Sequence, residues 1–155
     1  MSTTVRTPVN PYIGSLCRLV WQWVRREINE AVLAAGYDDL NPAHVALFRN
    51  PGPEGMRPTE LADEMQITKQ SVNELLGYLD RHGYLVRAPD PTDSRSRRIR
   101  LTGAGLELQA VIWQAAEAAE RKASAVIGDD RMRDLRASLI DLVTELDSAG
   151  EAPPP

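Results

Sequence analysis

Four arginines stand close together in the stretch DPTDSRSRRIRLT, residues 90–102. They are Arg95, Arg97, Arg98 and Arg100, in a chain of 155 residues whose formal net charge is −4. A guanidinium group donates several hydrogen bonds in a fixed planar fork, which suits the oxygens of phosphate groups. The stretch therefore predicts either contact with a polyanion or a solvated turn, and Arg95 and Arg98 are the better candidates for such a contact.

A second group of polar side chains lies at the start of a predicted helix, in TKQSVNE. Hydroxyl, amide and ammonium groups can bond to base edges and phosphates, and the positive end of a helix dipole also favours phosphate. The candidate DNA contacts in this group are Thr68, Lys69, Gln70, Ser71, Asn73 and Glu74. Glu74 differs from the others because its carboxylate repels phosphate, so it either accepts from the N4 amino group of a cytosine or lowers the affinity.

The spacing of apolar residues predicts the elements that position these two groups. The segments YLVRAPD and RRIRL are expected to be short strands, joined by the arginine-containing turn. In RRIRL apolar residues alternate with arginines, so one face of that strand is predicted to be apolar and the other cationic. Helices are expected over about 12–35, in NPAHVALF with Asn41 as N-cap, in TELADEM after Thr59, over 68–82 after Thr68, over 102–127 after Thr102, and from Asp129 or Asp130 to about 147.

The two short helices within residues 59–83 are joined by QIT, and such a turn of three to four residues is typical of a helix-turn-helix. Ala62 is small where the helices would cross, Ile67 would fill the turn, and Gln66 stands where such proteins often place glycine. A hairpin directly after a helix-turn-helix makes a winged helix, and an arginine at the hairpin tip can enter a minor groove. We therefore predict a mainly α-helical fold with a small β-hairpin wing, in which residues 41–102 form a winged helix-turn-helix DNA-binding domain.

The distribution of charge and the inventory of reactive groups favour a binding protein. Residues 67–102 carry seven basic and four acidic side chains, whereas residues 103–155 carry five basic and ten acidic ones. This asymmetry indicates a nucleic-acid face in the middle of the chain. We expect neither enzymatic activity nor a cofactor or metal, because His44 and His82 lack metal-ligand spacing with Cys17 and no glycine-rich phosphate loop is complete. The N-terminus lacks the apolar segment of a signal peptide and no apolar run is long enough to span a membrane, so we expect a cytoplasmic protein.

The helices near the two ends of the chain predict an oligomer. Apolar side chains of the last helix recur at alternating gaps of three and four residues, which is typical of a coiled-coil-like seam. The alternative is packing within one chain, but little else in the sequence is expected to cover this seam and the apolar first helix. We expect residues 11–36 and 103–147 to form a helical dimerisation region, with flexible tails at residues 1–10 and 148–155. The residues of the seam are Met132, Leu135, Leu139, Leu142 and Leu146.

Residues 59–105 resemble the winged helix of the MarR (multiple-antibiotic-resistance regulator) family of transcription factors. The resemblance rests on the run Asp90-Pro91-x-Asp93-x-Arg95, followed by Leu101-Thr102 and Gly105, and with the flanking helices it covers about residues 11–147. It implies an obligate homodimer with intertwined terminal helices, recognition helices in successive major grooves of double-stranded DNA, and wings in the flanking minor grooves. It also implies that Arg95 reaches a minor groove and that Asp93 helps to hold the wing.

Together, the residue patterns and the resemblance predict a homodimeric, sequence-specific regulator that binds a pseudo-palindromic operator, as a repressor that a small aromatic ligand could release. The alternative is a winged-helix dimer that binds ligands or proteins and binds DNA weakly or not at all. Two departures from the family pattern are Ser94 and Glu74, each of which stands where the family often has arginine. Glu74 and the acidic balance of the chain motivate the alternative.

The resemblance also implies that family members often have a small-molecule pocket between the dimerisation and DNA-binding parts. Aromatic residues on the helices that would line this pocket are candidate ligand contacts, and the alternative is that they belong to the core. These candidates are Trp21, Trp23, Tyr37, His44 and Trp113.

Cys17 stands in the sequence LCRLVW, which is similar to the cysteine context of peroxide-sensing members of the same family. Where those members have two tyrosines, this chain has Trp21 and Ala31. A redox sensor also needs a lowered thiol pKa. We therefore predict a buried core thiol, with a redox sensor as the alternative.

Overall fold

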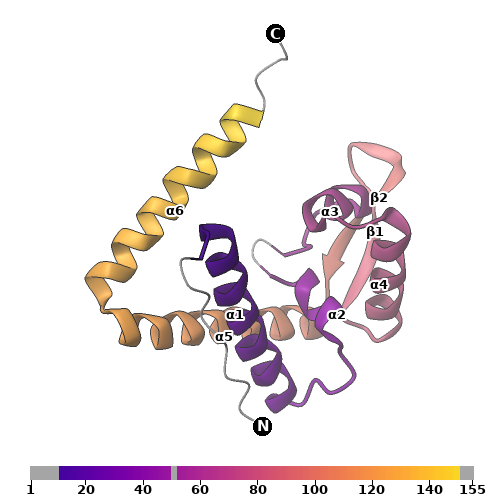
Figure 1. The fold of residues 1–155 in the computed structure, drawn as a ribbon. Coiled ribbons are helices and arrows are strands. Elements are labelled where there is room, and N and C mark those ends of the chain that lie inside the picture. Colours follow the sequence, from indigo (N-terminus) through magenta and orange to yellow (C-terminus); the bar gives the residue numbers. More distant parts are fainter. Residues whose placement is uncertain (1–10, 50–51, 151–155) are drawn as a thin grey trace. The chain divides into compact units, whose positions relative to one another are not determined.

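The computed structural model describes residues 11–49 and 52–150, which form helices and one β-hairpin (Figure 1). This confirms the predicted fold class, mainly helical with a small β-hairpin wing. The chain divides into two compact units, with the boundary between Ala116 and Glu117. In chain order the elements are α1 (Ile13–Ala34), α2 (Pro42–Leu47), α3 (Pro58–Met65), α4 (Lys69–Arg81), β1 (Leu85–Asp90), β2 (Asp93–Leu101), α5 (Gly103–Ile127) and α6 (Asp129–Gly150).

Three helices begin where the sequence predicts, because a side chain caps each of them. Side-chain oxygens of Asn41, Thr68 and Thr102 accept backbone N–H groups in the first turns of α2, α4 and α5, at distances between 2.9 and 3.2 Å. Such contacts satisfy N–H groups that the helix itself leaves without a partner. The start of α4 is therefore fixed by its own sequence.

The predicted start of α3 is wrong by a small amount. The helix begins at Pro58, with Arg57 as the N-cap residue, and Thr59 lies inside the first turn. The fixed backbone angle of proline suits the first helical position, and the Glu60 carboxylate accepts the N–H of Arg57 at 2.7 Å. These two features determine the start.

The predicted ends of α6 also differ from the structure. Gly128 precedes the helix with a φ of 91°, and Asp129 and Asp130 lie in the first turn instead of capping it. Their carboxylates still favour this end, because the helix dipole is positive there. The helix continues to Gly150, so residues 148–150 of the predicted tail are helical. The predicted tails at residues 1–10 and 151–155 lie outside the described part of the chain.

The hydrophobic core of the first unit joins α1 to α4, the hairpin and the first part of α5. The buried stripe of α4 matches the sequence prediction, since Val72, Leu76 and Leu79 are fully buried and Leu75 is partly buried. Ala62 is buried in α3, as predicted, whereas Ile67 is 37% exposed, so its side chain is only partly covered in the turn. Other fully buried side chains are Leu47, Phe48, Leu85, Ile99 and Leu108.

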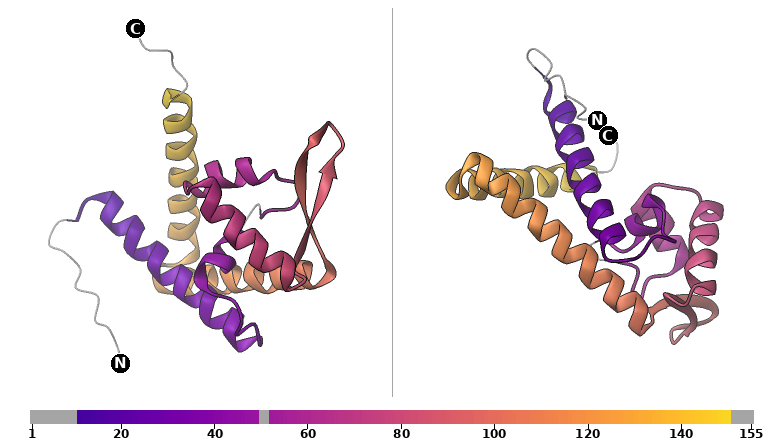
Figure 2. Two further views of the ribbon diagram at one scale, coloured as in Figure 1. Left: turned by 90° about the vertical axis from the view of Figure 1, so that its right-hand side faces the viewer. Right: turned by 90° about the horizontal axis from the view of Figure 1, so that it is seen from below.

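The hairpin is held on both sides of β2. Strand β1 pairs with β2 in antiparallel register from Leu85↔Leu101 to Asp90↔Asp93, with an irregularity near the tip. On its other side Ile99 exchanges two backbone hydrogen bonds of 2.8 Å, with Gly55 and Met56. The tip of the hairpin projects from the rest of the first unit (Figure 2). A firmly anchored base therefore carries a projecting tip.

Apolar side chains of the terminal helices stay exposed in the single chain. On α1 they include Ile13, Leu16, Val20 and Trp21, and on α6 they include Leu135, Leu139, Leu142 and Leu146. On each of these helices the exposed apolar side chains are therefore candidates for contact with another chain. Among the described residues, no helix combines the length and hydropathy needed to cross a membrane.

Candidate nucleic-acid interface

The turn between α3 and α4 adopts the helix-turn-helix geometry without a glycine. Gln66 ends α3 with φ 53° and ψ 41°, in the left-handed region. This region disfavours residues that carry a Cβ atom, although a single residue in a turn can adopt it. Gln66 therefore adopts the backbone conformation that glycine usually has at this position, and because it carries a Cβ atom its backbone is strained there.

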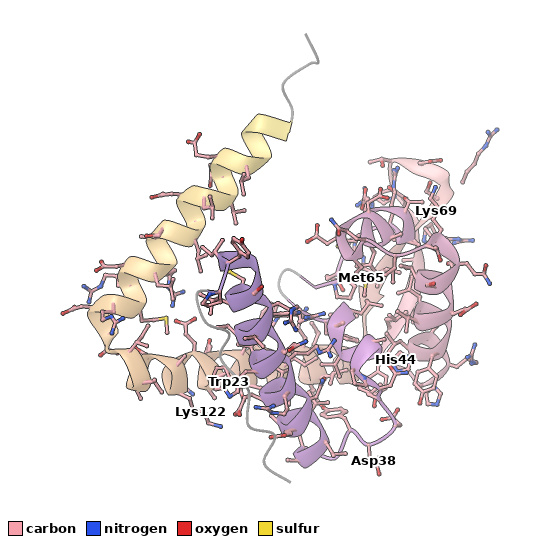
Figure 3. The ribbon with its side chains drawn as sticks, in the orientation of Figure 1. Trp23, Asp38, His44, Met65, Lys69 and Lys122 are labelled. Carbon is pink, nitrogen blue, oxygen red and sulfur yellow. The ribbon has the colours of Figure 1, made fainter. Side chains whose placement is uncertain are left out.

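The N-terminal part of α4 presents polar side chains to solvent. Lys69 lies at the first position of this helix (Figure 3). The Nε2 atom of Gln70 donates to the Glu74 carboxylate at 3.1 Å, so these two side chains form a pair on the helix surface. The hydroxyls of Thr68 and Ser71 lie 2.9 Å apart. All six predicted contact residues of this segment, Thr68, Lys69, Gln70, Ser71, Asn73 and Glu74, are exposed.

Asn73 is held by a residue that the sequence reasoning missed. Arg87 of β1 donates to the side-chain oxygen of Asn73 at 2.9 Å and to its backbone oxygen at 3.2 Å. The exposed face of α4 therefore adjoins the base of the wing. In the sequence Arg87 is only one of several basic residues, because nothing in its neighbourhood indicates a partner 14 positions away.

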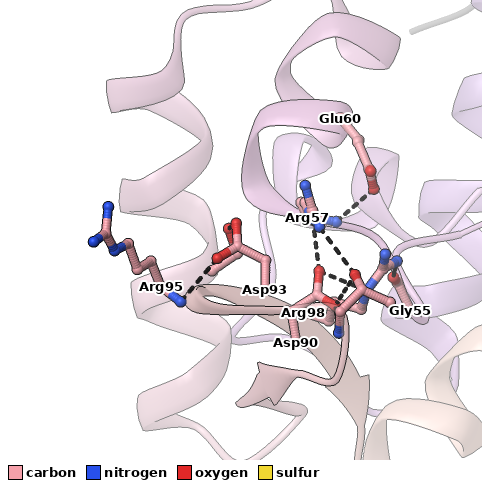
Figure 4. Close-up of polar contacts among 9 residues, drawn as sticks. Gly55, Arg57, Glu60, Asp90, Asp93, Arg95 and Arg98 are labelled. Atoms are coloured by element: carbon pink, nitrogen blue, oxygen red, sulfur yellow. Dashed lines mark hydrogen bonds and ion pairs between the residues drawn. The ribbon is translucent and has the colours of Figure 1, made fainter.

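The tip of the wing is built around Asp93. Its carboxylate accepts the backbone N–H of Arg95 at 3.0 Å and the hydroxyl of Ser96 at 2.7 Å. These two hydrogen bonds lower the pKa of Asp93, the bond from Ser96 more than the bond from Arg95, so the carboxylate form is favoured. The exposed side chain of Arg95 points away from the rest of the hairpin (Figure 4).

Arg98 has a different environment from Arg95, although the sequence groups them together. Its Nε atom lies 2.9 Å from the carboxylate of Asp90, and its Nη1 donates to the backbone oxygen of Gly55 at 2.6 Å. The expected contact of Arg98 with DNA is therefore not supported by its geometry, since the guanidinium is engaged inside the domain.

Asp90 is the centre of a cluster that joins the wing to α3 (Figure 4). Its side chain is fully buried and also accepts the Nε–H of Arg57 at 2.7 Å. Thr92 donates to it through its backbone N–H at 2.9 Å and through its hydroxyl at 2.7 Å. The bonds from Thr92, together with those from Arg57 and Arg98, hold the pKa of Asp90 well below its ordinary value. A charged, fully bonded carboxylate thus fixes the base of the tip.

Arg100 is engaged in the same way further along β2. Its Nη1 lies 3.0 Å from the carboxylate of Glu54, which also accepts the backbone N–H of Leu101. The apolar face of this strand is buried at Ile99, as expected. The other face is less cationic than the sequence suggests, because Arg98 pairs with an acid of β1 and Arg100 pairs with an acid of the segment before α3.

The candidate ligand residues do not gather in one cavity. A cavity of about 320 Å³ is bordered by Trp21 of α1 and by residues of α2 and α3, with the Arg49 guanidinium 4.4 Å from the ring centroid of Trp21. His44 borders a second pocket of about 510 Å³ beside α4. Tyr37 packs instead against Tyr84, with ring centroids 6.2 Å apart. Trp113 is 41% exposed on α5, and Trp23 is half-buried on α1.

His44 has a local structural role. Its Nδ1 accepts the backbone N–H of Asn41 at 3.3 Å, which completes the cap of α2. Its ring stacks on Tyr78 of α4 at 4.2 Å, and Tyr78 stacks on His82 at 3.9 Å. Burial lowers the pKa of His44, opposed in part by Asp39, so the neutral ring that this cap requires is favoured.

Cys17 is exposed, so the prediction of a buried core thiol is wrong for the single chain. It lies in the N-terminal half of α1, where neighbouring apolar side chains are exposed too. Over the described residues, no cluster of three or more His, Cys, Asp or Glu side chains has the arrangement of a metal site.

Comparisons with known proteins show similarity to transcription regulators over part of the chain. Residues 39–96 match the model of the MarR family. Over 105 residues the chain is 29% identical to the transcriptional activatory protein BadR of Rhodopseudomonas palustris, a match that covers 66% of this chain and 58% of that protein.

Solved structures show the same fold. The crystal structure of MarR matches with a TM-score of 0.78 and 21% identity, over 95% of this chain and 99% of that one. A MarR transcriptional regulator from Methanosarcina mazei Go1 matches with a TM-score of 0.73 and 21% identity, over 88% and 97% of the two chains.

Proposed function

We propose that the chain is a homodimeric, sequence-specific DNA-binding regulator of the MarR type, because residues 39–96 match the model of that family and solved MarR structures share its fold. The observation that carries the proposal is the combination of an exposed polar recognition helix with a braced wing that ends in an exposed arginine. Arg87 connects these two parts through Asn73. The proposed site of action is the cytoplasm, and no enzymatic role is proposed.

Helix α4 is the proposed reader of the major groove. Thr68, Lys69 and Ser71 surround its N-terminal end, where donors and the helix dipole suit phosphate. Gln70 and Glu74 are proposed to contact base edges as a pair. Their mutual hydrogen bond uses one donor of Gln70 and leaves mainly acceptors, which favours bases with an exocyclic amino group, such as cytosine.

The wing is proposed to place Arg95 in a minor groove, where the negative potential attracts a guanidinium. The two hydrogen bonds to Asp93 hold the turn from which Arg95 projects. Arg98 is proposed to stabilise the wing through Asp90 rather than to contact DNA. One arginine of the stretch thus has the DNA-binding role and another has a supporting role.

The exposed apolar surfaces of α1 and α6 support the proposed homodimer. In a two-fold dimer each protomer contributes the same residues to the interface. A second copy of the chain would therefore cover the exposed apolar side chains of α1 and those of α6. Two recognition helices in such a dimer address half-sites about 34–36 Å apart on a pseudo-palindromic operator. Covering α1 would also bury Cys17, which disfavours a redox role for this thiol.

The proposed effector is a small aromatic molecule in the cavity beside Trp21. The cavity lies between α1, α2 and α3, so an occupant would touch the helix-turn-helix directly. Repression is the proposed mode of regulation, because occupancy of a promoter is sufficient for it. The relative BadR is named as an activatory protein, so transcription from a promoter that carries the operator must be measured with and without the protein.

Selection of bound duplexes from a random DNA pool tests the proposal. We expect an enriched pseudo-palindrome whose affinity exceeds that of an unselected duplex and falls steeply between low and moderate salt, since phosphate contacts release counterions. Absence of enrichment at both salt concentrations would contradict the proposal. That outcome would favour the alternative, a winged-helix dimer that binds ligands or proteins, which the acidic balance and Glu74 motivate.

A further inference from the structure

Arg87 links the wing to α4 through a single residue of that helix, Asn73. Its Nη1 donates to the Oδ1 atom of Asn73 at 2.9 Å, and its Nη2 donates to the Asn73 backbone oxygen at 3.2 Å. The planar fork of the guanidinium matches this pair of acceptors, which a lysine ammonium would not reproduce. Asn73 is therefore held in one place from the wing side.

The other end of the Asn73 amide is held from within the helix. Its Nδ2 donates to the backbone oxygen of Lys69 at 2.9 Å. Rotation of the amide by 180° would turn its nitrogen toward the donors of Arg87 and its oxygen toward the carbonyl of Lys69, and both contacts would be lost. The two partners thus fix which end of the amide is the acceptor and which is the donor.

The held amide retains hydrogen-bonding capacity. One of the two lone pairs of Oδ1 and one of the two hydrogens of Nδ2 remain. An acceptor beside a donor is complementary to adenine in the major groove, which presents the N6 amino group beside N7. An amide that can flip offers this pattern in either order, whereas a fixed amide offers it in one.

We propose that Arg87 is a positioning residue that fixes the amide of Asn73 and thereby makes α4 select adenine at one base pair of each half-site. The proposal rests on the proposed function, because it requires that α4 enter the major groove of an operator. It gives Arg87 a role in sequence selection without a direct contact to a base. It also links that selection to the wing, since Arg87 belongs to β1.

The test compares binding of selected operator duplexes that differ only at one base pair. We expect the wild type to prefer adenine at one position of each half-site by about tenfold or more, which is the range of a good bidentate base contact. Arg87→Met keeps the length of the side chain but removes its donors, and it should lose this preference while preferences at other positions remain. Asn73→Ala should lose the same preference, and the double variant should behave as Asn73→Ala does, because Arg87 acts through Asn73. Arg97→Met is the matched control, which removes another wing arginine and should leave the preference intact.

Asn73→Asp provides an independent variant. It retains an acceptor for Arg87 but lacks the Nδ2 donor, so it should lose the adenine preference even though the contact with Arg87 persists. Thermal melting of each variant reports whether its fold is retained. The inference is overturned if Arg87→Met keeps the wild-type preference. It is also overturned if Arg87→Met weakens all duplexes equally, as loss of a phosphate contact would. If the wild type selects no sequence, the proposed function itself is contradicted. If the wild type is selective and the variants are equally selective, only the proposed role of Arg87 is contradicted.

Discussion

Leu142→Ala is expected to weaken the dimer while leaving the fold of the single chain intact. Leu142 lies on the seam of α6 and is 43% exposed in the chain. Full burial of a leucine side chain contributes about 1.5–3 kcal/mol, so covering the exposed part of Leu142 contributes about 1 kcal/mol in each protomer. A two-fold interface contains this residue twice, which makes about 2 kcal/mol per dimer, or about a 30-fold increase in the dissociation constant of the dimer.

Sedimentation equilibrium over a range of protomer concentrations measures this dissociation constant directly. Asp141→Ala is the matched control, because it truncates the neighbouring side chain, which lies about 100° away around α6 and off the seam, and it should leave the constant unchanged. Equal constants for the wild type and Leu142→Ala would refute the assignment of this seam to the dimer interface. A monomeric variant that has also lost its helical circular dichroism would show that Leu142 acts within the chain instead.

Three further predictions concern the turn, the wing base and base selection. Gln66→Gly should raise the free energy of unfolding by about 0.5–1 kcal/mol, because glycine relieves the strain of the left-handed conformation and only part of that gain is lost to the greater entropy of glycine in the unfolded chain. Chemical denaturation measures this change, and an unchanged or lower midpoint would contradict it. Thr92 and the two guanidiniums lower the pKa of Asp90 in the folded state, so its stabilising effect is complete above the ordinary carboxyl pKa of about 3.9 and is lost as the pH falls below it. The difference in melting temperature between the wild type and Asp90→Asn should therefore shrink below about pH 4, and a difference that stays constant with pH would count against the cluster. Glu74→Gln adds a donor where Gln70 already donates, so the sequence selected from a random pool should change near one base pair, whereas an identical consensus would remove Glu74 from the reading surface.

Local signals in the sequence were sufficient to place the main elements. Asn41, Thr68 and Thr102 cap their helices through neighbours only two or three positions away, so a short window contains the whole interaction. The buried stripe of α4 follows the helical period for the same reason. In the wing turn Asp93 bonds to residues directly after it, a role that only the resemblance to the MarR family implied.

Pairings between distant segments could not be predicted in this way. Arg98 was grouped with Arg95 because both belong to one basic stretch, yet its partners Asp90 and Gly55 come together only when the hairpin packs beside α3. Arg57 carries no local signal at all, since its contact with Asp90 joins residues 33 positions apart. A stretch of arginines therefore predicts a cationic surface only after the acids that the fold brings to it are known.

The prediction that Cys17 is buried was wrong for a different reason. An apolar helix predicts burial, but it does not say whether the covering surface belongs to the same chain or to another copy. In the single chain the first half of α1 stays exposed, and Cys17 with it. The same ambiguity applied to the seam of α6.

Binding of the selected operator by Arg95→Ala tests the central claim most directly, because Arg95 projects from the braced tip of the wing and makes its proposed contribution only on DNA. We expect the affinity to fall about tenfold or more and the slope of log affinity against log salt to decrease by about one, while the melting temperature and the dimer remain unchanged. Arg131→Ala, which removes an exposed arginine from α6, should bind as the wild type does. If Arg95→Ala also binds with wild-type affinity and salt dependence, the wing does not contact DNA and the account of this protein as a winged-helix DNA reader is contradicted.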